Sequence, residues 1–429
     1  MMNRFEWGKS TMVVNELAGE ICGKDYCRSC RHPKLFSALD LGSLPIANEL
    51  VRNSKIGLEV FPLHLKICPM CGLGQVEDVV SPERLFSDYR YLSSMSASFV
   101  EHAQKFARTS FEEIVFTDTD WVLEIASNDG YLLKHFIDLG VKVLGVEPAK
   151  NIATLAKENG IPTVNEFFSS ALAETLLESH GSPKLIVANN VMAHVPNLRD
   201  FVAGLAVLTG SETVVSIENP SLMNFISGDQ FDSIYHEHFS YLTAHSVKWI
   251  AANNGLELFR VEEVQTHGGS NRYWLRKAGN RNLDFPDVEV KISREKTMGL
   301  LDEDVWQAFA ARIQNLIASF HDWVEDLNKN GKILCGFGAA AKASTLINSS
   351  QINQKWIRAI ADSSPEKQGW FMPTLGIPIV SPQEMESLSP TDIIIFPWNI
   401  SEELNSFIKQ QFNPEIRTWI AVPKIKEME

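Results

Sequence analysis

Apolar and polar residues follow one another along the middle of the chain in a pattern that predicts alternating strands and helices. An apolar run at 121–125 is typical of a buried strand, and apolar residues then recur at helical spacing over 132–136. Further strand-like runs, mostly separated by helical segments, lie at 141–146, 184–189, 213–218, 256–264 and 271–276. Such an order predicts an α/β sheet with helices on both faces, and sheets of this kind bind ligands at the carboxyl ends of their strands.

The pattern also predicts a smaller domain on each side of this sheet. Strand-like pieces lie at 39–46 and 60–67 before it, and at 332–337 and 357–362 after it. A helical pattern over 89–106 bridges the first two parts, and a long one over 302–327 leads into the third. We therefore expect an N-terminal domain over 20–88, a central Rossmann-like domain over 89–300 and a C-terminal Rossmann-like α/β domain over 301–429.

Composition narrows the classes of partner. With 429 residues, 45% of them hydrophobic, the chain is long enough for two or three hydrophobic cores. The net charge of −14 argues against a nucleic-acid partner, because phosphate binding needs clustered Lys and Arg. No window approaches the roughly 20 apolar residues of a membrane span, and no secretory leader is recognisable. We expect a cytoplasmic protein with a small-molecule partner; the oligomeric state stays open, and a monomer is compatible with the sequence.

Four of the six cysteines form two pairs, Cys27-Arg-Ser-Cys30 and Cys68-Pro-Met-Cys71. Two such pairs predict a tetrahedral zinc site, and four thiolates leave no open coordination position, so the zinc is expected to be structural. Two disulfides are disfavoured in a reducing cytoplasm, and a redox Cys-x-x-Cys motif needs no second pair. Cys22 is close enough in sequence to be an alternative ligand.

The first strand of the central sheet ends in a short polar turn, from Ala126 to Gly130. It lacks the G-x-G-x-x-G fingerprint of a pyrophosphate site, and Asp129 repels phosphate. Glu147 ends the next strand, where an acid can bind the hydroxyls of a ribose. A cationic nucleoside such as S-adenosylmethionine (SAM) suits this turn better than NAD does. The alternative is a strand and a helix that bind no ligand.

The segment 231–241 concentrates ionisable residues after the strand at 213–218. Tyr235, His236, Glu237 and His238 supply a base near neutral pH, a carboxylate to orient it and a phenolic donor for a developing oxyanion. This set suits proton abstraction beside a carbonyl group. A polar loop without chemistry and a His-x-His metal site are the alternatives.

The C-terminal part contains a turn of small residues, Gly336-Phe-Gly338-Ala-Ala-Ala-Lys342, between a strand and a helix. As a dinucleotide fingerprint it is incomplete, because Ala341 replaces the third glycine. Lys342 and the helix N–H groups can still hold a phosphate, and Asp362 ends the following strand. Close packing of the helix on the sheet explains the same small residues.

Eight motifs occur in the order typical of one family. They are CRSC, CPMCGLGQ, YRYLSSMS, LEIASNDGYLL with VEPAKNIA, NNVMAHVPNL, FDSIYHEHFSY, HGGSNR, and GFGAAAKASTLIN with ADSSPEKQGWFMPTLGIPI. With these the chain resembles, almost end to end, the sugar C-methyltransferases, three-domain proteins acting on nucleotide-linked deoxy-ketohexoses. The resemblance implies a class I methyltransferase fold in the centre, SAM as methyl donor, and a C-terminal domain that helps to hold the sugar nucleotide.

The resemblance also implies residue roles. It implies that His238 is the general base, that Tyr235 and Glu237 lie beside it, and that His194 and Tyr89 surround the sugar ring. We assign the expected cofactor contacts to Glu124, Ala126, Ser127, Asn128, Asp129, Gly130, Glu147, Pro148, Asn189 and Asn190. We assign the expected substrate contacts to Tyr91, His236, Arg272, Gly338, Ala340 and Lys342. Ala126 replaces the family's usual glycine; its methyl group is tolerated at negative φ and crowds the cofactor at positive φ.

The expected reaction begins when His238 removes a proton from a carbon next to a ketone. Glu237 is expected to favour the protonated imidazole, and Tyr235, with His194 or Tyr89, to stabilise the enolate oxygen; His236 is the alternative base. By analogy with the family, the substrate is a dTDP-4-keto sugar methylated at C3. The rival functions are an O- or N-methyltransferase of another small metabolite and a nucleotide-sugar-binding protein without catalysis. Hydride transfer is disfavoured by the incomplete C-terminal fingerprint.

Overall fold

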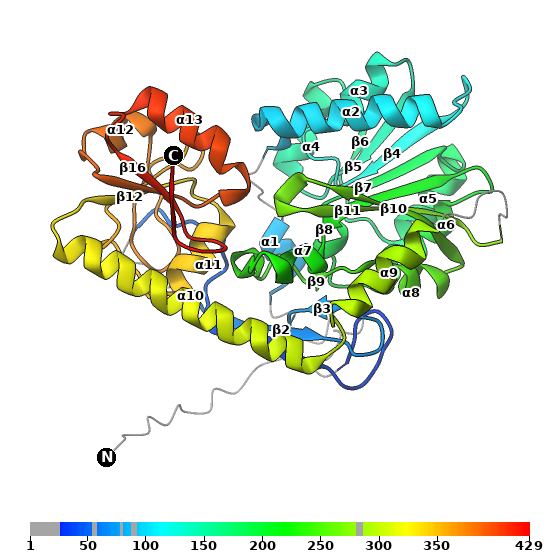
Figure 1. Cartoon of the computed structure of the whole chain (residues 1–429). Coiled ribbons are helices and arrows are strands. Elements are labelled where there is room, and N and C mark those ends of the chain that lie inside the picture. Colours follow the sequence, from blue (N-terminus) through cyan, green and yellow to red (C-terminus); the bar gives the residue numbers. More distant parts are fainter. Residues whose placement is uncertain (1–25, 54–57, 78–79, 87–91, 280–285) are drawn as a thin grey trace.

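The computed structural model describes residues 26–53, 58–77, 80–86, 92–279 and 286–429. The described residues form three β-sheets, and the chain passes through them from a small N-terminal sheet to two larger α/β units (Figure 1). No helix among the described residues is long and apolar enough to cross a membrane.

The central sheet has seven strands in the order β10-β11-β8-β7-β4-β5-β6. Their bounds are β4 (Trp121–Ile125), β5 (Lys142–Val146), β6 (Thr163–Val164), β7 (Leu185–Asn189), β8 (Val214–Pro220), β10 (Leu256–Val264) and β11 (Ser270–Lys277). Strands β4 to β8 run parallel, and β11 lies antiparallel between β8 and β10. The chain moves outward from β4 to β6 and then returns to β7, so the strand order reverses beside β4. Open α/β sheets bind ligands at the carboxyl ends of their strands at such a reversal.

Helices cover both faces of this sheet, as the strand–helix alternation predicts (Figure 1). One face carries α2 (Ala97–Glu113), α3 (Leu133–Asp138) and α4 (Lys150–Glu158), which share an apolar core. The other carries α5 (Ser170–His180), α6 (Leu198–Leu208), α8 (Ala244–Ala252) and α9 (Asp287–Thr297), which share a second core. The predicted helix over 89–106 is shorter at its start: α2 begins at Ala97, where the Ser96 side chain accepts a hydrogen bond from the Phe99 N–H.

The N-terminal sheet has the order β1-β2-β3-β9 and draws one strand from far along the chain. Its strands are β1 (Phe36–Leu44), β2 (Phe61–Ile67), β3 (Gly74–Gln75) and β9 (Ser240–Tyr241), and α1 (Pro82–Phe86) follows β3. Strand β9 forms the end of the ionisable segment 231–241, two residues after His238. The N-terminal domain and this segment therefore share a sheet, which the apolar periodicity does not predict.

The C-terminal sheet has the order β14-β13-β12-β15-β16-β17, parallel except for its last strand. Its strands are β12 (Leu334–Phe337), β13 (Ile360–Ala361), β14 (Ile379–Val380), β15 (Asp392–Ile395), β16 (Arg417–Ile420) and β17 (Lys426–Met428). Its helices are α11 (Ala341–Ser349), α12 (Pro382–Glu386) and α13 (Ser401–Gln411).

The long helix α10 (Glu303–Lys329) runs from the N-terminal sheet to the C-terminal sheet (Figure 1). Its buried residues Trp306, Phe309 and Phe320 belong to one core together with Leu39 of β1 and Leu334 of β12. A single apolar stripe on this helix therefore packs against two domains and joins their cores.

Candidate active site

The four paired cysteines come together at one point of the N-terminal domain. Their Sγ atoms all lie within 4.8 Å of one another, with Cys27 and Cys71 separated by 3.5 Å and Cys30 and Cys68 by 3.4 Å. Sulfurs around a tetrahedral zinc with 2.3 Å bonds lie about 3.8 Å apart, so the cluster fits this ion. Cys22, the alternative ligand, lies outside the described residues. Residues 26–53, 58–77, 80–86, 92–279 and 286–429 contain no second cluster of three such ligands, so a His-x-His metal site gains no support.

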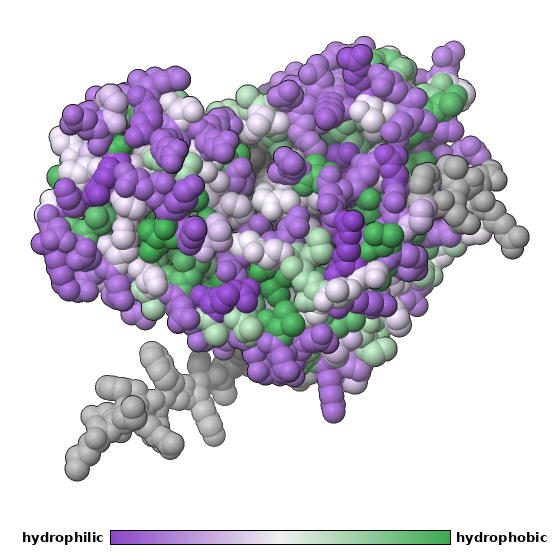
Figure 2. All heavy atoms as spheres, in the orientation of Figure 1, coloured by the Kyte–Doolittle hydropathy of each residue, from purple (hydrophilic) through white to green (hydrophobic). Residues whose placement is uncertain are grey.

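A cleft of about 1740 Å³ lies between the central and C-terminal units (Figure 2). The carboxyl ends of β4, β5, β7 and β8 form one wall, and residues 337–342 and 362–367 of the C-terminal domain form the opposite one. The segment 231–241, called the catalytic loop below, supplies residues that line the middle of the cleft.

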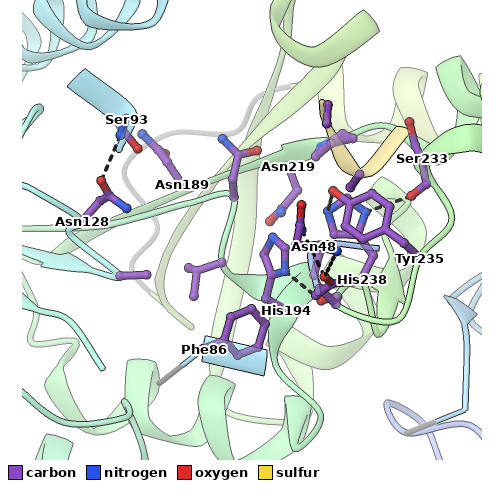
Figure 3. A pocket seen from close by; sticks show the side chains of 18 of the residues that line it. Asn48, Phe86, Ser93, Asn128, Asn189, His194, Asn219, Ser233, Tyr235 and His238 are labelled. Carbon is purple, nitrogen blue, oxygen red and sulfur yellow. Dashed lines mark hydrogen bonds between the residues drawn. The ribbon is translucent and has the colours of Figure 1, made fainter. Parts of the chain in front are cut away.

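At the end nearest β4 and β5, six of the ten predicted cofactor residues line the cleft. They are Ala126, Asn128, Glu147, Pro148, Asn189 and Asn190. The Glu147 carboxylate accepts hydrogen bonds from the N–H groups of Asn128 (3.0 Å) and Ala149 (2.9 Å), while burial raises its pKa. The Asn128 side chain accepts a hydrogen bond from the Ser93 N–H at 2.9 Å (Figure 3). An acid and amides at the carboxyl ends of adjacent parallel strands suit a nucleoside with free hydroxyl groups, as SAM has.

The other four predicted cofactor residues lie behind the wall of the cleft. Glu124, Ser127, Asp129 and Gly130 are absent from its lining, and burial raises the pKa of Glu124 well above the ordinary value. Gly130 has φ +82°, and a Cβ atom there would lie 2.4 Å from Ile161. These residues shape the turn, and their expected contact with the cofactor stays a prediction.

Ala126 adopts a left-handed conformation with φ 56°. This is the unfavourable case considered for its methyl group, because left-handed φ costs an alanine roughly 1–2 kcal/mol. Asn128 (φ 49°) and Asn190 (φ 53°) share this conformation and also line the cleft. Strained residues of this kind cluster where a backbone is shaped around a ligand.

The hydrogen bonds of His238 identify its basic atom. Nδ1 lies 3.0 Å from the Ser233 carbonyl oxygen, which can only accept, so Nδ1 carries the proton of the neutral ring. Nε2 therefore holds the lone pair, and it accepts a hydrogen bond from the Tyr235 hydroxyl at 2.7 Å (Figure 3). Both residues line the cleft, so a proton acceptor faces it.

His194 lies beside this pair, with its ring centroid 4.7 Å from that of His238. Burial lowers the pKa of His194 to about 4, so the ring is neutral at pH 7. Nδ1 donates to the Glu237 carbonyl at 2.7 Å, which leaves Nε2 as an acceptor. In this tautomer the ring presents Nε2 to its surroundings as a hydrogen-bond acceptor, and the expected place of His194 beside the sugar ring stays a prediction.

Glu237, expected beside the base, lines the cleft, and its carboxylate is hydrogen-bonded to the N-terminal domain. The carboxylate accepts hydrogen bonds from the N–H (3.2 Å) and the side-chain amide (3.0 Å) of Asn48, in the N-terminal domain (Figure 3). Burial raises the pKa of Glu237. Its carboxylate fixes the loop against Asn48, and the Ser233 carbonyl orients the His238 ring.

Two predicted substrate residues lie outside the lining of the cleft. The Nε2 atom of His236 contacts the Phe61 carbonyl at 3.2 Å, and its ring packs edge-on against Phe61. Arg272 forms an ion pair with the buried Glu218 at 2.6 Å. Both side chains have partners within the protein, and their expected contacts with the substrate stay predictions. Tyr89 and Tyr91, for which roles were also predicted, lie outside the described residues.

Gly338, Ala340 and Lys342, for which substrate contacts are predicted, line the C-terminal wall. Lys342 Nζ donates to Ser233 Oγ at 3.0 Å and lies 4.4 Å from the centroid of the Trp398 ring. Burial lowers the pKa of Lys342 and raises that of the neighbouring Asp232 to about 6. The predicted phosphate-binding lysine therefore also contacts the residue whose carbonyl orients His238.

Sequence reasoning missed Asn219, at the carboxyl end of β8. The residue is 1% exposed and lines the cleft, and neither side-chain polar atom has a hydrogen-bond partner among the described residues. An amide buried without a partner costs about 1–3 kcal/mol, so this one is suited to a ligand. The only signal in the sequence was a polar residue directly after the predicted strand over 213–218.

Together, the strand order, the strand-end acid and the cysteine cluster define a class I SAM-dependent methyltransferase with a structural zinc site. Three family models match the chain: a zinc binding domain over 27–86, a methyltransferase domain over 85–261 and the C-methyltransferase C-terminal domain over 265–423. The chain is 31% identical to the C-methyltransferase NovU of Streptomyces niveus over 382 residues, 89% of this chain and 91% of that relative. It belongs to the C-methyltransferase family.

Solved structures with a similar fold include a SAM-dependent methyltransferase of Anabaena variabilis, with 15% identity and a TM-score of 0.34 over 42% of this chain and 85% of that one. Another is the SAM-bound magnesium protoporphyrin IX methyltransferase of Synechocystis, with 13% identity and a TM-score of 0.32 over 46% and 89%. At these TM-scores the likeness adds nothing to the strand order.

Proposed function

We propose that this SAM-dependent C-methyltransferase acts on a nucleotide-linked deoxy-4-ketohexose, a dTDP sugar methylated at C3. The cleft supports this proposal because it extends from the cofactor end, past the His238 base, to the Gly338–Lys342 turn of the C-terminal domain. A sugar nucleotide whose sugar lies at the base and whose phosphates lie at the Gly338–Lys342 turn would use both walls of the cleft. The observation that carries the proposal is the Nε2 lone pair of His238 in this cleft.

Proton removal next to the ketone uses Tyr235 as well as His238. Because Nε2 already accepts from the Tyr235 hydroxyl, the phenol oxygen takes the proton from carbon while its own proton moves to Nε2. The products are an enolate, a neutral phenol and an imidazolium whose Nδ1–H remains on the Ser233 carbonyl. The Tyr235 phenol is then a donor for the enolate oxygen.

SAM, when bound, supplies an electrophilic methyl group, and Ala126, Asn128, Glu147 and Asn190 are placed to hold it. The enolate carbon is the nucleophile for that methyl group. The unpartnered Asn219 amide is left for a polar group of the sugar. The side chains thus bind, orient and move one proton, which is what methylation of carbon requires beyond a donor.

Labelled SAM and a panel of nucleotide-linked 4-ketohexoses test the proposal. We expect transfer to a carbon, identified by a new C-methyl resonance in the NMR spectrum of the isolated product. The matched control is the same sugar nucleotide with a hydroxyl at C4, which has no acidified C–H and should not be methylated. Methyl transfer to oxygen or nitrogen would establish the rival enzyme, and binding of both ligands without transfer would establish a binding protein.

A further inference from the structure

One arginine of the zinc site lies against the catalytic loop. Arg28, between Cys27 and Cys30, is only 1% exposed. Its guanidinium donates to the Val76 carbonyl at 2.7 Å and to the Phe239 carbonyl, and its own N–H donates to Gln75 Oε1 at 2.9 Å. Phe239 directly follows His238, so the first Cys-x-x-Cys turn is bonded to the residue after the base.

Two further contacts attach the same loop to the N-terminal domain. Asn48 binds the Glu237 carboxylate through two hydrogen bonds, and the Phe61 carbonyl contacts the His236 ring. Strand β3 then pairs with β9 at the end of the loop. Residues 236, 237 and 239 are thus all held by the N-terminal domain, while Tyr235, Glu237 and His238 line the cleft.

From these contacts we propose that Arg28 is a positioning residue for the His238 base, so that the zinc-binding domain holds the catalytic loop in its reactive geometry. The proposal rests on the proposed function. An arginine suits this position because its planar fork can donate to two carbonyls at once, one on each side of the β3–β9 junction. A lysine keeps the charge but presents a single ammonium group, so one of the two carbonyls loses its donor.

The effect on the reaction follows from geometry. A displacement of about 1 Å in a reacting group can lower the rate about 10²-fold. The cofactor residues lie on the turns after β4, β5 and β7, whereas Arg28 contacts residues 75, 76, 239 and 240. Loss of the Arg28 fork should therefore lower kcat and leave the affinity for SAM unchanged.

The decisive comparison is Arg28→Lys against Arg31→Lys. Arg31 is an exposed residue of the same zinc turn, and its guanidinium lies 4.9 Å from the centroid of the Tyr26 ring, so the control makes the same substitution away from the Val76 and Phe239 carbonyls. For Arg28→Lys we expect kcat to fall on the order of 10²-fold, with the SAM Kd and the zinc content unchanged. We also expect amide hydrogen exchange in the peptide 231–241 to be at least about tenfold faster, as the loop opens more often. Arg31→Lys should match the parent protein in all four measurements.

Unchanged exchange in 231–241, or loss of zinc and SAM binding together with activity, would overturn the positioning role. Asn48→Ala removes a different contact to the same loop, and it should accelerate exchange in the same peptide even if Arg28→Lys folds poorly. Hydrogen exchange needs no substrate, so the two proposals fail separately. If the parent protein methylates no ketohexose, the proposed function is wrong, while the exchange data still decide the role of Arg28.

Discussion

The cofactor turn and the catalytic loop face the same cleft but are held in different ways. The turn at 126–130 is fixed by neighbours in the central sheet: Ser127 N–H donates to the Val146 carbonyl, and Asn128 N–H to Glu147, 19 residues away. The catalytic loop is held by residues from two other domains. Asn48, Arg28 and Trp398 contact it across 189, 211 and 166 residues of sequence.

Because the two regions are held differently, we expect cofactor binding and methyl transfer to depend on different parts of the protein. A turn held by adjacent strands forms whenever the central sheet folds. A loop held from both sides takes its shape only when the N-terminal and C-terminal domains are both in place. The C-terminal side contributes through Lys342, which contacts Ser233, and through Trp398, which donates to Asp232 at 2.8 Å. We therefore expect the two regions to respond independently to substitution.

The largest expected effect comes from His238→Asn. The asparagine amide can still donate to the Ser233 carbonyl, but the Nε2 lone pair is lost. General base catalysis contributes on the order of 10²–10⁴ in rate, so kcat should fall by that factor. Titration calorimetry should give an unchanged SAM Kd, because the cofactor turn is held separately. Near-normal turnover would remove His238 from the mechanism, and weakened SAM binding would end the independence of the two regions.

His194 predicts a pH dependence of stability. Its pKa is lowered from 6.5 to about 4 by burial, so the unfolded chain binds the proton more tightly than the folded one. The shift therefore contributes about 3 kcal/mol to the free energy of unfolding above pH 6.5, and this contribution is lost as the pH falls toward 4. His194→Asn keeps a donor for the Glu237 carbonyl but cannot titrate. Denaturant unfolding from pH 7 to pH 4 should show a shallower loss for this variant, and parallel curves would contradict the assignment.

Asn219→Leu tests the wall between the two regions. Leucine has a similar volume but cannot hydrogen-bond, so a substrate group that binds the amide is left unpaired, at a cost of about 1–3 kcal/mol. We expect KM for the sugar nucleotide to rise roughly 5- to 150-fold, with an unchanged SAM Kd and a melting temperature no lower than that of the parent. If SAM affinity falls instead, Asn219 belongs to the cofactor end of the cleft.

The smallest expected effect is that of Ala126→Gly. Glycine relieves a left-handed strain of roughly 1–2 kcal/mol but adds freedom to the unfolded chain worth about 0.4–1 kcal/mol. The net gain in unfolding free energy should be about 1 kcal/mol, measured by chemical denaturation, and kcat should stay unchanged. Gly145→Ala is the opposite control, since a Cβ atom there would lie 2.3 Å from Ser127 Oγ and strain the same turn. A destabilised Ala126→Gly variant would show that packing contacts of the methyl group outweigh the backbone strain.

Local patterns predicted the parts of the molecule that depend on neighbours in sequence. Apolar periodicity located the strands β4, β5 and β7, and the carboxyl ends of these strands placed Glu147 and Asn190 in one cleft, because parallel strands end at a common edge. The spacing of Cys27, Cys30, Cys68 and Cys71 predicted their cluster, since two tight turns present four thiolates at tetrahedral distances.

The catalytic loop shows where this reasoning stops. The segment from Tyr235 to His238 is visible in the sequence as a concentration of ionisable residues, yet its side chains divide between the cleft and the N-terminal domain. The Glu237 carboxylate binds Asn48, which lies more than 150 residues away in the sequence. The curvature of the loop brings the Ser233 carbonyl to His238 Nδ1 and so decides which ring nitrogen bears the proton. A short range of sequence specifies burial through periodicity, but the partners of Glu237, His236 and Asp232 come together only when the domains pack. Short stretches of sequence therefore determine the residue types and the ends of the strands, and the tertiary structure determines the chemical roles of those residues.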